Sequence, residues 1–295
     1  MQEVRGLIFY SNGHNGDIHY SRNFVKDIMS QMPIQAEYKF NCSAKLLKDI
    51  LNLSFNNFNI FQFNDMEILY DESTKCLFVN TWVGSSRAKF IQNEVGCSLT
   101  ANYNKFKEIY FNLNLELKSP DFYVPDVNWS KYDTSFVDEF ISKNVFKKYI
   151  LIANGEVLSG QSSFIDFNLI VKNLSIKYTD VCFIMTDIKN KIYQPNVFYT
   201  SDFIKTDGGD LNEIGYLSTK VNFIIGRGSG PFCFAHNKDN LFDKNKKFLA
   251  ITKYRTDGLW ALPEQLPTEQ AKQLWTNMFD NNTIYSIISK EIESN

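Results

Sequence analysis

The sequence predicts an α/β protein made of two parallel-sheet domains that face a cleft. Short apolar segments alternate with segments of helical spacing along the chain, which is typical of parallel sheets covered on both faces. The pattern also starts twice, because an apolar segment that breaks at a glycine-bearing loop and continues as an amphipathic helix occurs at the N-terminus and again at Tyr149. We therefore expect an N-terminal domain in residues 1–130 and a C-terminal domain in residues 131–295.

Length, charge and cysteine content exclude several classes of protein. The 295 residues suffice for two domains, and the net charge of -2 with a pI near 6.0 gives no general attraction to nucleic acid. No apolar run reaches transmembrane length and the first residues do not resemble a signal peptide, so we expect a cytoplasmic protein, with peripheral membrane contact left open. The five cysteines are scattered without a CxxC pair, which indicates neither a disulfide framework nor a zinc site and predicts buried thiols, most clearly Cys182.

The N-terminal half alternates strands and helices as far as a linker. We expect strands at residues 6–10, 36–40, 59–63, 67–70 and 76–82, helices at residues 18–32, 44–51 and 87–113, and a hairpin loop at residues 70–75. The segment "KSPDFYVPDVNWS", at residues 118–130, has two prolines and no period. It is the predicted linker between the domains.

The C-terminal half repeats the alternation. We expect helices at residues 135–146, 164–176, 210–220 and 268–292, and strands at residues 149–154, 181–186, 196–200 and 221–226. The last helix is expected to pack back across the domain boundary.

The first loop, in "FYSNGHNGDIHYSRNFVKDIM", joins a strand to a helix through two glycines. Glycines let a ligand approach the backbone, and the free N–H groups of a helix start favour anions. A tight turn with Asp17 as the N-cap explains the same residues. His14 and His19 flank Asp17, which adds proton transfer or acceptor binding as a functional interpretation.

A second glycine loop, "IIGRGSGPFCFAH", follows a predicted strand late in the chain. Gly226, Gly228 and Gly230 alternate with Arg227 and Ser229 at the carboxyl end of that strand, where open α/β sheets bind ligands. The spacing fits neither a dinucleotide fingerprint nor a Walker P-loop. Backbone N–H groups with a guanidinium and a hydroxyl suit phosphate or diphosphate oxygens. The alternative is a turn whose arginine faces solvent.

Together, "NGHNGDIHYSRNFVKDI" and "DLNEIGYLSTKVNFIIGRGSGPFCFA" resemble the GT-B glycosyltransferases, in particular the heptosyltransferase-like family. The resemblance rests on Gly16-Asp17 at the first helix and on Ser229-Gly230-Pro231 in the late loop. It implies two Rossmann-like domains facing a cleft, with a nucleotide-sugar held by the C-terminal domain and an acceptor presented by the N-terminal one. It also implies that Asp17 is the general base, and that Ser229, Gly230 and neighbouring amides hold the diphosphate.

Glycosyl transfer from a nucleotide-diphosphate sugar needs a base for the acceptor hydroxyl and positive or N–H groups for the leaving diphosphate. The chain contains no Asp-x-Asp, which favours a metal-independent mechanism. We therefore expect an inverting, metal-independent glycosyltransferase of carbohydrate biosynthesis that needs no cofactor and acts on a saccharide, glycolipid-type or other hydroxyl acceptor. A nucleotide-sugar epimerase or hydrolase of the same fold and a non-catalytic nucleotide- or sugar-binding protein are the alternatives.

The predicted site residues fall into three groups. Trp82 ends a predicted strand and can stack on a sugar or lie in the core, while Glu156 and Arg255 belong to loops expected near the donor. The predicted catalytic residues are Asp17, His14 and His19; those for the donor are Gly226, Arg227, Gly228, Ser229, Gly230, Pro231, Glu156 and Arg255; those for the acceptor are Asn15, Arg22 and Trp82. No metal ligand is expected.

Overall fold

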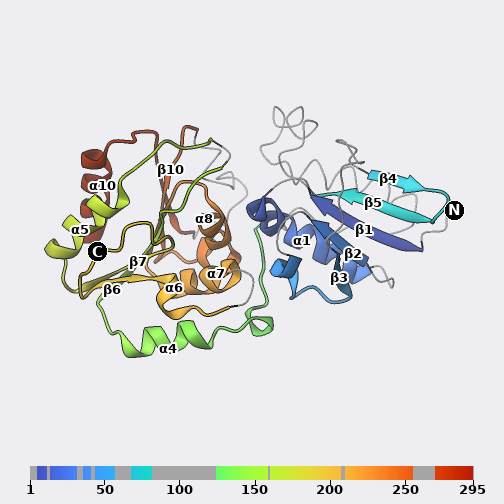
Figure 1. The fold of residues 1–295 in the computed structure, drawn as a ribbon, viewed down its shortest axis with the longest axis horizontal. Helices are drawn as coiled ribbons and strands as arrows, with labels where there is room; N and C mark the ends of the chain where they lie inside the picture. Colours follow the sequence, from blue (N-terminus) through green and yellow to red (C-terminus); the bar gives the residue numbers. More distant parts are fainter. Residues whose placement is uncertain are drawn as a thin grey trace. The chain divides into compact units, whose positions relative to one another are not determined.

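The computed structural model describes residues 5–11, 14–31, 36–40, 44–56, 68–81, 124–158, 160–206, 210–254 and 270–294. These residues form two compact units, with the change from the first to the second between Tyr132 and Asp133. Each unit is an α/β layer structure built on one sheet (Figure 1). The predicted α/β class is therefore confirmed.

The described residues of the N-terminal unit form a five-stranded sheet in the order β3-β2-β1-β5-β4. Its elements are β1 (Gly6–Ser11), α1 (Asn15–Gln31), β2 (Ala36–Phe40), the 3₁₀ helix η1 (Ala44–Leu47), β3 (Leu53–Asn56), β4 (Ile68–Asp71), β5 (Cys76–Asn80) and the 3₁₀ helix η3 (Trp129–Lys131). β1 is central and pairs in parallel with β2 and β5, whereas β4 pairs with β5 as an antiparallel hairpin. The carboxyl end of the central strand thus leads directly to the start of α1.

The C-terminal unit has a fully parallel six-stranded sheet in the order β11-β10-β9-β6-β7-β8. Its strands are β6 (Lys148–Ala153), β7 (Val181–Met185), β8 (Val197–Tyr199), β9 (Phe223–Gly226), β10 (Lys247–Ile251) and β11 (Lys272–Thr276). Its helices are α4 (Ser135–Lys143), α5 (Phe167–Lys177), α6 (Thr200–Phe203), α7 (Leu211–Lys220), α8 (Gly230–Ala235), α9 (Lys238–Leu241) and α10 (Asn281–Glu293). This is a doubly wound order, and its direction reverses between β6 and β9.

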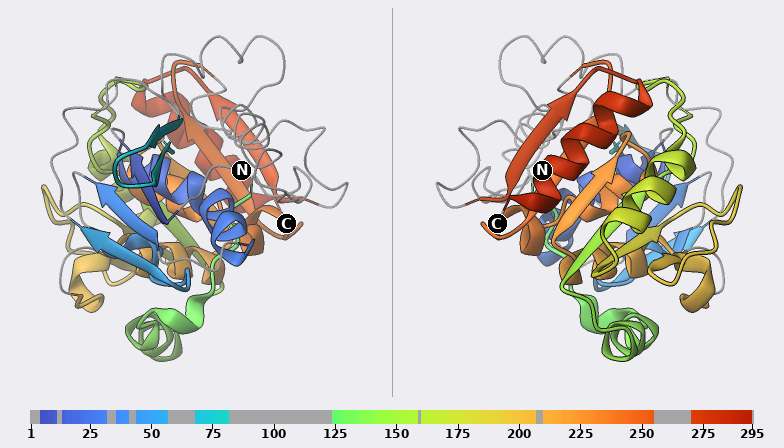
Figure 2. Two further views of the ribbon diagram at one scale, coloured as in Figure 1. Left: turned by 90° about the vertical axis from the view of Figure 1, so that its right-hand side faces the viewer. Right: turned by 90° about the vertical axis from the view of Figure 1, so that its left-hand side faces the viewer.

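Helices cover both faces of this C-terminal sheet. α5 and α10 lie side by side on one face, and α7 and α8 cover the other (Figures 1 and 2). The strands are buried on both faces, so they are apolar at every position, as in β7, where all five residues are buried. Alternate residues therefore serve two cores: Leu249 packs toward α5 and α10, while Phe248 contacts Phe232 of α8.

Several predicted elements need correction. The segment expected to be one helix over residues 268–292 is β11 followed by α10, because Lys272–Thr276 finds a strand partner in β10. β3 and β10 are additional strands, and the helix predicted at residues 44–51 is only the short η1. The strand predicted at residues 59–63 and the helix predicted at residues 87–113 lie outside the described residues.

Two further observations concern sequence predictions. In the described part of the chain, no helix combines the length and the apolar character needed to cross a membrane. Cys182 is fully buried in β7, as expected, and burial raises the pKa of its thiol. Cys42 and Cys97 lie outside the described residues.

Candidate functional site

The first candidate site lies where the strand order of the C-terminal sheet reverses. β6 and β9 are neighbours in the sheet although about 70 residues separate them in sequence, and their carboxyl ends lead into Asn154–Glu156 and Arg227–Gly230 respectively. The predicted glycine loop is therefore at the point where doubly wound sheets bind ligands. The loop that follows β6 reaches past β9 to β10, since Ser162 Oγ donates to the carbonyl of Ile251 in β10 at 2.9 Å.

The three glycines of the loop occupy their positions for different structural reasons. A Cβ at Gly226 would lie 2.4 Å from the ring of Phe232, so this position is glycine because α8 packs closely on β9. Gly228 has a φ of +76°, in the left-handed region that favours glycine. Gly230 starts α8, Ser229 is the N-cap residue, and Pro231 lies in the first turn, where its missing N–H costs no hydrogen bond.

Arg227 lies almost fully buried between the two loops. Its guanidinium donates to the carbonyls of Ser163 at 3.1 Å, Asn154 at 3.1 Å and Gly155 at 2.5 Å. These bonds fasten the loop after β6 to the loop after β9. The alternative of an arginine that faces solvent is therefore wrong, because the side chain is only 7% exposed.

The glycine loop also holds polar atoms without a protein partner. Arg227 Nε and Ser229 Oγ are buried and form no hydrogen bond. The backbone N–H groups of Gly228 and Ser229 donate to no other described residue. No carboxylate of the described residues forms an ion pair with Arg227, whose positive charge is thus uncompensated at contact distance. Buried donors are normally satisfied, so this loop has the donor set of an anion site.

Asn154, which sequence reasoning did not single out, organises the neighbouring strand end. Its Oδ1 accepts from the N–H groups of Thr186 at 3.0 Å and Asp187 at 2.8 Å, and its Nδ2 donates to the Asp187 carbonyl at 2.8 Å. The signal available in the sequence was a single amide at the end of the apolar run "YILIAN". Glu156 is exposed and forms an ion pair with Lys189, which lowers the pKa of Glu156 through a hydrogen bond and its charge.

The second candidate site is the start of α1. Asp17 is the third residue of this helix, and its Oδ2 accepts from the backbone N–H of His14 at 2.8 Å. Asp17 is therefore not the N-cap, because His14 precedes the helix and Asp17 reaches back to it as in a capping box. Oδ1 of Asp17 accepts from no other described residue. Beside it, Asn15 has a buried Oδ1 without a hydrogen bond.

Burial raises the pKa of Asp17, and the N–H and charge of His14 oppose this shift only in part. Asp17 keeps a partly exposed side chain, and His14 is exposed. A carboxylate with a raised pKa, a free oxygen and solvent access has the properties of a general base.

Two predicted residues on α1 lie away from solvent. Arg22 is 0% exposed and forms an ion pair with Asp49, while it also donates to Tyr132 Oη at 3.1 Å and to the Leu46 carbonyl at 2.8 Å. This placement argues against the predicted acceptor contact, because the guanidinium has no exposed surface. His19 is also 0% exposed, which argues against its predicted catalytic role for the same reason.

Trp82 and Arg255 lie outside the described residues. Within the described ranges, no group of three His, Cys, Asp or Glu side chains could hold a metal ion.

Comparison with known proteins identifies the fold. No family model matches the chain, and no curated protein matches it significantly. The solved structure of E. coli heptosyltransferase WaaC with ADP-2-deoxy-2-fluoro heptose matches 97% of this chain and 99% of its own, with a TM-score of 0.51 at 7% sequence identity. E. coli ADP-heptose lps heptosyltransferase II matches 97% of this chain and 98% of its own, with a TM-score of 0.50 at 9% identity.

The chain has a GT-B-type fold. The predicted resemblance to heptosyltransferase-like proteins is thus confirmed as a structural likeness over nearly the whole chain. Within this GT-B-type fold, Ser229-Gly230-Pro231 and Gly16-Asp17, the motifs that carried the resemblance, each follow the carboxyl end of a sheet strand, β9 and β1 respectively.

Proposed function

We propose that the chain is a metal-independent, inverting glycosyltransferase that moves a sugar from a nucleotide-diphosphate sugar to a saccharide or other hydroxyl acceptor. We assign donor binding to the C-terminal unit and acceptor presentation to the N-terminal unit. The full-length likeness to WaaC, whose solved structure contains an ADP-heptose analogue, supports this class of donor.

The observation that carries the proposal is the donor set of the glycine loop. Among the described residues, no carboxylate contacts Arg227, and none accepts from the hydroxyl of Ser229 or from the N–H groups of Gly228 and Ser229. In glycosyl transfer, negative charge develops on the diphosphate as the bond to the sugar breaks. Fixed donors at that position stabilise the transition state more than the ground state.

Asp17 is the proposed general base. Its Oδ1 takes the proton of the acceptor hydroxyl as that oxygen attacks the anomeric carbon, and the electron pair of the breaking bond leaves with the diphosphate. A single displacement of this kind inverts the anomeric centre. Burial raises the pKa of Asp17, which strengthens its carboxylate as a base.

The test is release of nucleoside diphosphate from a panel of nucleotide-diphosphate sugars, with and without added hydroxyl acceptors, in the presence of EDTA. We expect release with one donor, acceleration by an acceptor and no effect of EDTA. Acceptor-independent release indicates a hydrolase, conversion of the donor into its epimer without net release indicates an epimerase, and binding without either reaction indicates a binding protein.

The matched variant is Asp17→Asn. Loss of the base lowers turnover by about 10²–10⁴-fold. Because folding raises the pKa of the Asp17 carboxyl, ionisation of Asp17 destabilises the folded state. This loss of stability is complete at a pH above the pKa of Asp17 in the folded state. The asparagine variant is therefore expected to melt at the same or a higher temperature than the wild type at pH 7, which separates lost chemistry from lost folding. Exposed Asp180→Asn is the control and keeps full turnover.

A further inference from the structure

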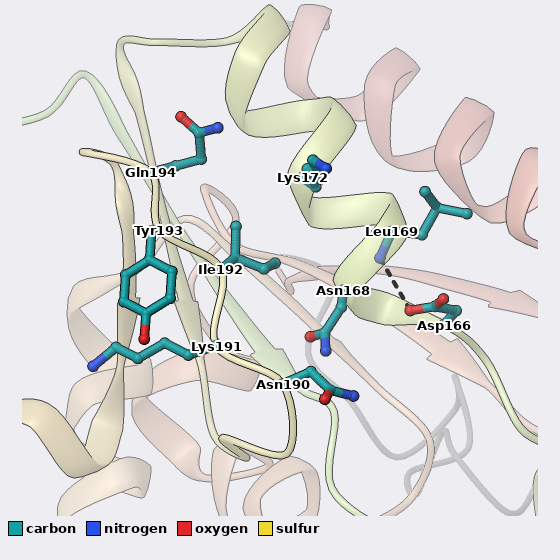
Figure 3. A pocket seen from close by; sticks show the side chains of 9 residues that line it. All are labelled: Asp166, Asn168, Leu169, Lys172, Asn190, Lys191, Ile192, Tyr193 and Gln194. Atoms are coloured by element: carbon teal, nitrogen blue, oxygen red, sulfur yellow. Dashed lines mark hydrogen bonds between the residues drawn. The ribbon is translucent and has the colours of Figure 1, made fainter.

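The C-terminal unit carries a groove that arises from an unusual crossover. The segment between the parallel strands β7 and β8, residues 186–196, contains no helix. It runs as an irregular segment beside α5, on the side of that helix away from α10 (Figures 2 and 3). A doubly wound fold normally fills this position with a helix. The space left is a cavity of about 570 Å³ between α5 and residues 190–194.

The crossover segment is held in place from its inner side. Ile192 packs against the core, and its N–H donates to Tyr199 Oη at 2.7 Å. Lys191 forms an ion pair with Asp202 at 2.7 Å. The groove is therefore a built feature of the unit, with one wall formed by a helix and the other by a fastened irregular segment (Figure 3).

Polar groups with unused hydrogen-bonding capacity line the groove. The side-chain amides of Asn168, Asn190 and Gln194 bond to no described residue. Asp166 uses Oδ1 to cap α5 through the N–H of Leu169 at 3.0 Å and keeps Oδ2 free. Tyr193 is 86% exposed.

These groups favour a neutral sugar chain as the ligand. Amides both donate and accept, which matches hydroxyls that do the same. The exposed ring of Tyr193 offers an apolar face to the C–H face of a sugar ring. The charges nearly cancel, since Asp202 neutralises Lys191 and Asp166 offsets Lys172, so a polyanion gains little here.

We propose that this groove is a secondary binding site for a neutral oligosaccharide. It holds a part of a glycan distant from the reacting hydroxyl and so raises the local concentration of the chain on which the enzyme acts. The choice of saccharide rests on the proposed function, whereas the groove and its free polar groups do not.

The test is a titration of the ¹⁵N-labelled protein with maltohexaose, cellohexaose and chitohexaose, without nucleotide. We expect amide shifts confined to residues 166–172 and 190–194 with at least one hexasaccharide. Tyr193→Ala should weaken this binding about tenfold, and Tyr193→Phe should keep it because the ring remains. Tyr254→Ala is the matched control, since Tyr254 is also exposed, at 69%, but follows β10.

Three results would overturn the proposal: no shift in the groove with any of the three sugars, shifts that Tyr193→Ala leaves unchanged, or preferential binding of a heparin hexasaccharide or an extended peptide. A parallel titration with nucleoside diphosphates reports separately on residues 226–233. If no nucleoside diphosphate binds but a hexasaccharide does, the proposed function is contradicted and the groove proposal stands. If a nucleoside diphosphate binds but no hexasaccharide does, the groove proposal is contradicted and the proposed function stands.

Discussion

Arg227 has a structural role in the glycine loop, whereas the side chain of Ser229 has none among the described contacts. The proposed donor site can therefore be tested at Ser229 without loss of stability. Arg227 holds two loops together through three carbonyls, so its removal damages the fold as well as any anion site. Ser229 Oγ bonds to none of the residues that the structure describes. We therefore propose a bound ligand as the partner of that hydroxyl.

Ser229→Ala is therefore expected to leave the melting temperature unchanged and to weaken nucleotide-diphosphate binding about 10–100-fold, the value of one hydrogen bond to a charged group. Ser162→Ala is the matched control, because Ser162 Oγ donates to the Ile251 carbonyl and has a structural role. Calorimetric titration and thermal melts of both variants check this. Lower stability without weaker binding in Ser229→Ala would show that the hydroxyl is structural.

His236 lies under the same loop and makes stability depend on pH. It is buried against the rings of Phe232 and Phe248, and burial lowers its pKa to about 3. The unfolded chain binds a proton near pH 6.5 that the folded chain does not bind until about pH 3. The stability that neutral His236 contributes is present above pH 6.5 and is lost as the pH falls toward 3.

Replacing His236 by glutamine should flatten the fall in the free energy of unfolding between pH 6.5 and pH 4. Denaturant titrations across this range measure it, with exposed His14→Gln as the control. An unchanged slope in His236→Gln would contradict the assigned pKa shift.

α1 is tied to distant parts of its unit by buried polar side chains. Arg22 and Asn23 of this helix bond to η1 and to the segment that ends at Tyr132: Asn23 Nδ2 donates to the Val124 carbonyl at 2.7 Å, and Tyr132 Oη donates to Asp49 Oδ1 at 2.8 Å. The helix that carries the proposed base is thus fixed by two sets of buried polar contacts, one that joins Arg22, Asp49 and Tyr132 and one that joins Asn23 to the segment before Tyr132.

Asp49→Asn breaks the ion pair and leaves Arg22 charged and buried, so we expect a loss of about 3–5 kcal/mol from the N-terminal unit. The double variant Arg22→Met/Asp49→Leu removes both charges and should recover much of that loss. Urea unfolding of wild type, single and double variants measures the effect. A single variant as stable as the wild type would show that the network contributes little.

Sequence reasoning succeeds or fails at this scale for identifiable reasons. β7 and β9 were predictable because strands buried on both faces are apolar at every position. β11 was misread as helix, since "KQLWT" has no such run and becomes a strand only through its pairing with β10. Arg22 looked like a ligand-binding cation, and its burial depends on Asp49 and Tyr132, far along the chain.

At the scale of the molecule, the strand order of the C-terminal sheet determines where the glycine loop lies. The pairing of β6 with β9 brings Asn154 beside Arg227. Strand order depends on long crossovers rather than local pattern, so the glycine loop was predictable from the sequence and its fastening to the loop after β6 was not. The GT-B-type fold is the structural frame in which we propose that the glycine loop binds a nucleotide-sugar donor.

The most direct test of this account is the melting temperature of the wild type and of Ser229→Ala in the presence of UDP, GDP, CDP, ADP and dTDP. At about 100 times its dissociation constant a ligand adds about 2.7 kcal/mol, or about 5–10 °C for a unit of this size. We predict such a rise with one nucleotide in the wild type and a smaller rise in Ser229→Ala. If none of the five raises the melting temperature of the wild type, the glycine loop is not a donor site and the proposed glycosyl transfer is contradicted.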